Sequence, residues 1–193
     1  MPAGRIFFAF VLLALLNSST LAKTKFFPTG LLTSQELDEF RNDWYSKQLQ
    51  AMQEGSLYET QPNHETYRLT WLRTFHHPMT FRLDIDDQCK ATLTVKETDG
   101  AGGYQPGAII LNKTIEIARP SCEKLTTGLV DLKFWSLSTS TPELGADGAE
   151  WILEGAKSGN YHVVDRWSPS TGAFYEWALS LMKLANTPLG EIY

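Results

Sequence analysis

Residues 148–169 read GAEWILEGAKSGNYHVVDRWSP, and this stretch predicts a β-hairpin. Two segments rich in β-branched and aromatic residues flank Ser158-Gly159, a dipeptide typical of a tight turn. Because successive side chains of a strand point to opposite faces of the sheet, the hairpin divides its residues into two sets. One face carries Glu150, Ile152, Glu154, Tyr161, Val163, Asp165 and Trp167, and the other carries Trp151, Leu153, His162, Val164 and Arg166.

Alternating apolar and polar residues upstream of this hairpin predict four more strands. These strands cover residues 67–75, 79–85, 89–97 and 108–118. Short turn sequences separate the first three strands, and the glycine-rich segment Asp99–Gly107 precedes the fourth. Because strands joined by short turns pair in an antiparallel manner, the chain predicts an antiparallel sheet of about six strands.

Apolar residues with a helical period predict about three helices. The first covers about residues 34–53, the second runs from Pro120 to about Leu132, and the last follows Pro169. No linker divides the chain, so residues 23–193 predict a single α+β domain, with the sheet and later helices over about residues 66–186. The runs of hairpins favour helices packed on one side of the sheet.

The amino terminus has the pattern of a secretory signal peptide. Arg5 precedes an apolar run over residues 6–16, which is too short for a transmembrane helix of about 20 residues. We therefore expect cleavage of residues 1–22 after Ala22. The mature chain would lie in the periplasm or outside the cell, without a transmembrane segment. An uncleaved, partly inserted anchor is the alternative.

The charge of the chain narrows the classes of partner that it can bind, and its two cysteines predict a disulfide. The chain has a net charge of −5 and no run of Lys or Arg, which argues against nucleic acid as a partner. We expect an envelope protein or a glycan instead; the composition leaves the oligomeric state open. Cys89 and Cys122 predict a disulfide in an oxidising compartment, and two buried thiols are the alternative.

The histidine, aspartate and glycine motifs predict neither a metal site nor a cofactor. His76 and His77 are adjacent, so their rings point in opposite directions on an extended chain. The aspartates around Asp86 lack the later glycine and glutamate of a calcium-binding EF-hand loop. The glycine-rich loop lacks the Gly-Lys-Ser/Thr sequence that binds nucleotide phosphates.

The hairpin also carries candidate catalytic residues. Glu154 and Asp165 are diagonal neighbours on one face, and a pair of carboxyl groups can hydrolyse a glycosidic bond. Arg166 or His162 would assist them in one pocket. The alternative is that these carboxylates lie on a solvated strand face or form ion pairs, with Arg166 or Lys157 as the candidate cations.

Three aromatic residues are candidates for ligand binding: Trp151, Trp167 and Tyr104. The tryptophans would line a groove if they were exposed, and Tyr104 lies in the glycine-rich loop, where binding residues are frequent. The alternative for the tryptophans is burial in the core, and Trp151 faces Arg166 as a candidate cation–π pair.

The segments LTVKETDGAGGYQPGAIILNKT, LVDLKFWSLST and GADGAEWILEGAKSGNYHVVDRWSP resemble a family of small secreted bacterial proteins that has no assigned activity. The resemblance extends over about residues 66–186, and the hairpin is its most specific part. It implies an exported, single-domain bacterial protein and transfers no catalytic residue.

Three functional hypotheses follow. The first is an exported binding or interaction module without catalytic activity, because no motif with a specific catalytic geometry is present. The second is a hydrolase of envelope glycans or peptides that uses Glu154 and Asp165. The third is an inhibitor or immunity-type protein, which an exposed aromatic patch or a protruding loop at residues 103–107 would favour.

Overall fold

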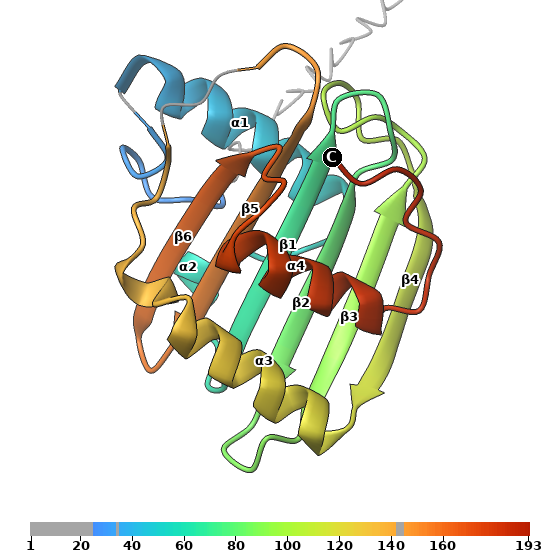
Figure 1. Cartoon of the computed structure of the whole chain (residues 1–193). Helices are drawn as coiled ribbons and strands as arrows, with labels where there is room; N and C mark the ends of the chain where they lie inside the picture. The colour runs from blue at the N-terminus through green and yellow to red at the C-terminus, as the bar shows by residue number, and fades with distance from the viewer. Residues whose placement is uncertain (1–24, 34, 142–144) are drawn as a thin grey trace, which may run out of the picture.

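The computed structural model describes residues 25–33, 35–141 and 145–193, so the predicted signal peptide over residues 1–22 lies outside the described residues. The elements follow one another along the chain as shown in Figure 1. They are α1 (Gln35–Ala51), α2 (Leu57–Thr60), β1 (Glu65–Arg73), β2 (Met79–Ile85), β3 (Ala91–Thr98), β4 (Ile109–Ile117), α3 (Arg119–Asp131), the 3₁₀-helix η1 (Phe134–Ser136), β5 (Ala149–Lys157), β6 (Asn160–Trp167) and α4 (Ala173–Leu184).

The six strands form one antiparallel sheet in the order β4-β3-β2-β1-β5-β6, which confirms the predicted α+β fold. In the β5–β6 hairpin, Glu154 pairs with Val163 and Ile152 pairs with Asp165. The turn residues Ser158 and Gly159 have φ values of 50° and 77°. Two positive φ values in a two-residue turn match the twist of the flanking strands and fix this register.

Helices α3 and α4 cross one side of the sheet, as Figure 1 shows, and we call this side the apolar face. It includes Tyr67, Leu69 and Trp71 of β1, which pack on apolar side chains of both helices. The disulfide between Cys89 and Cys122 joins the β2–β3 turn to α3, with the two Cα atoms 5.9 Å apart. The predicted disulfide is therefore confirmed.

Helix α1 covers the opposite side of the sheet, which we call the polar face because β1 presents Thr66, Arg68 and Thr70 there. The expectation that all helices pack on one side is wrong for α1. Its side chains Tyr45 and Leu49 pack against a second apolar cluster, which consists of Phe26, Phe27, Leu32, Leu72, Ile152 and Val163. The alternative of a solvated strand face is wrong for β5, because residues 149–156 are buried on both sides of the sheet.

Among the described helices, none is both long enough and apolar enough to cross a membrane.

Candidate functional site: a groove between α1 and the glycine-rich loop

Glu154, a predicted catalytic residue, lies in a buried ion pair. Its Oε2 is 2.6 Å from Nη2 of Arg68, and both side chains are fully buried. The Tyr161 hydroxyl donates a hydrogen bond to Oε1 at 3.0 Å. Burial raises the pKa of Glu154, and the charge of Arg68 opposes this shift. With both oxygens bound and no exposure to solvent, Glu154 serves to join β5 to β1.

Glu54, which follows α1, forms ion pairs with three cationic side chains on the polar face. Its carboxylate lies 2.7 Å from Lys96 Nζ, 3.0 Å from Arg82 Nη1 and 3.3 Å from Arg68 Nη1. Burial acts to raise the pKa of Glu54, but the three cations outweigh burial and lower it. These ion pairs fix the end of α1 to three strands of the sheet.

Asp165, the other predicted catalytic carboxylate, does not pair with Glu154. It contacts two residues of α1. Arg41 Nη1 lies 2.6 Å from Asp165 Oδ2, and the Tyr45 hydroxyl donates to the same oxygen at 2.9 Å. The carboxyl neighbour of Asp165 is Glu150, whose Oε1 lies 3.5 Å from Nη2 of Arg41. Burial, together with the negative charge of Asp165, raises the pKa of Glu150 to about 9.

His162 and Arg166, the predicted assisting residues, lie on the opposite face of the sheet from Glu154 and Asp165. His162 Nε2 is 3.0 Å from the carbonyl oxygen of Leu137, and burial lowers its pKa. Arg166 donates hydrogen bonds to main-chain carbonyl groups at residues 138 and 139. The four candidates do not converge in one pocket, which the hydrolase hypothesis required.

Trp151 is fully buried in the core, which corrects its predicted role in ligand binding. Its ring lies 5.7 Å from that of Trp71 and 5.6 Å from that of Tyr175, and its indole N–H donates to the carbonyl oxygen of Tyr193. Arg166 was predicted to form a cation–π pair with Trp151. In the structure its guanidinium lies over the ring of Phe174, 5.9 Å from the ring centroid. Trp151 therefore anchors β5 to α4 and to the carboxyl terminus.

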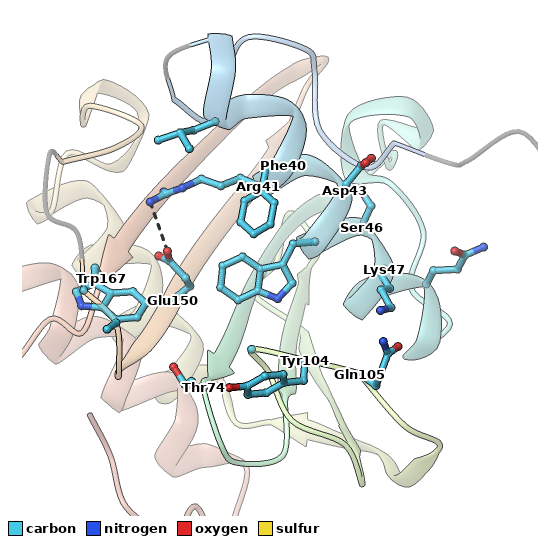
Figure 2. Close-up of a pocket in the computed structure, with 16 residues that line it drawn as sticks. Phe40, Arg41, Asp43, Ser46, Lys47, Thr74, Tyr104, Gln105, Glu150 and Trp167 are labelled. Atoms are coloured by element: carbon cyan, nitrogen blue, oxygen red, sulfur yellow. Dashed lines mark ion pairs between the residues drawn. The ribbon is translucent and has the colours of Figure 1, made fainter.

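Trp167 and Tyr104, the other two binding candidates, line the same groove, which has a volume of about 780 Å³. The groove lies between α1 and the glycine-rich loop, and Glu150 and Trp167 contribute to it from the β5–β6 hairpin (Figure 2). Its lining also includes Leu37, Phe40, Arg41, Asp43, Trp44, Ser46, Lys47, Gln50, Thr74, Gly103, Gln105, Gly145 and Ala146.

Phe40 on α1 and Tyr104 on the loop are the most exposed aromatic side chains of this groove. Phe40 is 64% exposed and Tyr104 is 60% exposed. On α1, Leu37, Phe40 and Trp44 follow the i, i+3, i+7 spacing of one helical face. This spacing in the sequence predicts that the three side chains share one face of the helix. Because a buried helix face has the same spacing, the sequence does not predict that this face lines a groove.

The glycine-rich loop is held against α1 and the end of β1 by hydrogen bonds to its main chain. The indole N–H of Trp44 donates to the carbonyl oxygen of Gly102 at 2.7 Å, and Gln48 Nε2 donates to the same oxygen at 3.0 Å. A Cβ atom at Gly102 would lie 2.6 Å from the carbonyl oxygen of Arg73. Only glycine allows this close approach, which places Tyr104 across the groove from α1.

Within the described ranges, no three His, Cys, Asp or Glu side chains gather closely enough to hold a metal ion. No model of a known protein family matches the chain, and no curated protein matches it either. The functional argument therefore rests on the groove and its neighbouring charges.

Proposed function

We propose that this chain is an exported binding protein without catalytic activity, and that its ligand occupies the groove between α1 and the glycine-rich loop. One observation carries the proposal: exposed aromatic side chains from two distant parts of the sequence, Phe40 and Tyr104, line one cavity of about 780 Å³. Cavities that bind small molecules commonly have about 300–1,000 Å³ and aromatic walls.

Exposure of large aromatic side chains has a cost that a bound ligand would relieve. Transfer of apolar surface out of water is favourable by about 25 cal/mol per Å². Phe40 projects into solvent although other side chains of α1 are buried against the sheet. Contiguous exposed apolar side chains on a folded protein mark an interaction surface.

A binding role is favoured over hydrolysis by the state of the carboxyl groups. Glu154 is fully buried against Arg68, and Asp165 is held by Arg41 and Tyr45. A glycosidase needs two carboxyl groups that reach the same bond from a cleft. Since Glu154 does not line the groove, the pair proposed from the sequence lacks a common substrate position.

Export is supported by the disulfide and by the predicted signal peptide with cleavage after Ala22. Disulfides persist in oxidising compartments such as the periplasm and the extracellular space. The resemblance to small secreted bacterial proteins agrees with this location. We place the mature chain, residues 23–193, in one of these two compartments.

Inhibition of an exported enzyme is a second candidate function, favoured by one specific observation. The rings of Phe75 and Tyr104 stack with their centroids 6.1 Å apart, and Phe75 is itself 59% exposed. Phe75 and Tyr104 thus form an exposed, stacked aromatic pair, and aromatic residues are enriched among interface hot spots.

Native mass spectrometry of the chain purified gently from the envelope of a bacterial host tests these proposals. We expect the mature chain to begin at Lys23, to be two hydrogens lighter than its reduced form, and to carry a bound mass. The bound mass should be lost in a Phe40→Ser/Tyr104→Ser double variant and kept in Val130→Ser, which changes an exposed residue of α3. A small bound mass favours the binding protein, and a bound protein favours the inhibitor. A bare wild-type chain, or a bound mass that the double variant also retains, contradicts the role of the groove.

A further inference from the structure

Glu150 lines the groove with a carboxyl group that lacks a full set of partners. The residue is 3% exposed, and the described part of the chain offers its buried Oε2 no hydrogen-bond donor. The neighbouring Asp165 Oδ1 is also buried and finds no donor among the same residues. A protonated Glu150 could donate a hydrogen bond to Asp165, whereas two carboxylates cannot donate to one another.

The charges that face Glu150 from the described residues do not balance unless Glu150 holds a proton. From α1, Arg41 and Tyr45 face the pair, and from β6, Asp165 does so. The single guanidinium lies 2.6 Å from Asp165 but 3.5 Å from Glu150, so Asp165 is its closer partner. Among the described residues, the two carboxyl groups thus share one fixed cation, Arg41.

Lys47, the second cation that α1 contributes to this groove, does not lie next to Glu150. Figure 2 shows Lys47 beside Gln105, at the other end of the groove from Glu150, with Phe40 between them. Next to Glu150 the groove is therefore lined by aromatic rings and by Arg41, the guanidinium that Asp165 binds at 2.6 Å.

The aromatic lining provides a second, independent attraction for a cation. Phe40, Trp44, Tyr104 and Trp167 all contribute to the groove. The negative faces of aromatic rings attract cations, and cages of such rings bind alkylated ammonium groups. The net charge of −5 adds a long-range attraction of the same sign.

We propose that the groove binds an organic cation, an ammonium group with apolar substituents, with Glu150 as its counter-charge and the aromatic rings as its walls. This inference rests on the proposed binding function, because it names the ligand class of the same groove. Glu150 ionises when the cation binds in the groove, so binding releases the proton of Glu150 to solvent.

Three probes with the same phenylbutyl group and different charge test the inference. They are (4-phenylbutyl)trimethylammonium, 4-phenylbutanol and 4-phenylbutyrate. Isothermal titration calorimetry measures their affinities, and buffers with different ionisation enthalpies report the protons released. We expect the ammonium probe to bind about tenfold more tightly than the alcohol, with the carboxylate weakest. Affinity for the ammonium probe should rise with pH up to about 9, where Glu150 ionises in the empty groove.

A Glu150→Gln variant should lose both the preference for the ammonium probe over the alcohol and the proton release. Gln keeps the shape of a protonated Glu, and Glu123→Gln on exposed α3 provides the matched control, with wild-type behaviour expected. If the alcohol or the carboxylate binds the groove as tightly as the ammonium probe, the cation proposal is wrong and the binding function stands. If no probe shifts the amide resonances of residues 40, 44 and 104, the cation proposal is wrong, and the bound mass in native mass spectrometry decides the binding function separately.

Discussion

Glu154 on β5 and Arg68 on β1 are register partners, and they form an ion pair in which neither side chain reaches solvent. The pair has further partners on both sides, because Tyr161 donates to Glu154 and Arg68 reaches Glu54 at 3.3 Å. Burial of a charged group is unfavourable unless an opposite charge or a hydrogen bond compensates for it. Each of these four residues therefore depends on the others. Glu154 thus contributes a fixed charge to the polar face and not a reactive group to a cleft.

Substitution Glu154→Gln should destabilise the fold by about 3 kcal/mol, because it leaves Arg68 buried with less compensation. Urea unfolding followed by circular dichroism measures the change. Glu123→Gln is the matched control: its partner Arg119 is exposed, and such surface pairs contribute less than about 0.5 kcal/mol. Equal losses in the two variants would contradict the structural role of Glu154.

Loss of the Cys89–Cys122 disulfide should lower the free energy of unfolding by about 3–4 kcal/mol, because the bond closes a loop with a sequence separation of 33. A Cys89→Ser/Cys122→Ala variant, or reduction of the wild type, tests this by urea unfolding. The bond holds α3 to the β2–β3 turn, so hydrogen exchange should accelerate most in residues 119–131. A reducing agent should not change the urea midpoint of the variant. An unchanged midpoint for the reduced wild type would contradict the prediction.

The stability of the empty protein should fall as pH rises from about 5 to about 9 through the contribution of Glu150. The pKa of Glu150 is about 9 in the folded chain and 4.5 in a reference carboxyl group, so between these values the folded chain binds the extra proton. Rising pH removes this contribution, which is lost once the pH passes the folded pKa. Glu150→Gln should flatten the profile, and unfolding at several pH values measures the slope in both proteins. A slope that persists unchanged in the variant would assign it to other groups.

A Gly102→Ala substitution should displace the glycine-rich loop and cost about 1–3 kcal/mol, since the added methyl group would lie 2.6 Å from a main-chain oxygen of Arg73. The indole N–H resonance of Trp44 should shift because its acceptor is the carbonyl of Gly102. Gly55→Ala is the control, as its new Cβ would lie no closer than 3.8 Å to Thr60 Cγ2. Wild-type stability and an unshifted indole resonance in Gly102→Ala would show that the loop tolerates a side chain.

The sequence identified the correct face of the hairpin but selected the wrong pair of carboxyl groups on it. Glu150 and Glu154 each lie two residues from Ile152, the register partner of Asp165, so the hairpin alone makes them equivalent neighbours of Asp165. Helix α1 breaks this symmetry by placing Arg41 between Asp165 and Glu150. The helix lies more than a hundred residues upstream, and strand periodicity carries no information about such distant contacts.

Local rules determined the strands, the three main helices, the hairpin register and the disulfide, because each depends on side-chain period, on turn conformation or on the only two cysteines in the chain. Tertiary structure decided which polar residues are buried and which aromatic residues are exposed. The alternation of side chains along a strand shows which residues share a face of the sheet. The packing of α1 decides whether water or protein covers that face. For this reason Trp151 became part of the core, while Trp167 and Tyr104 came to line one groove.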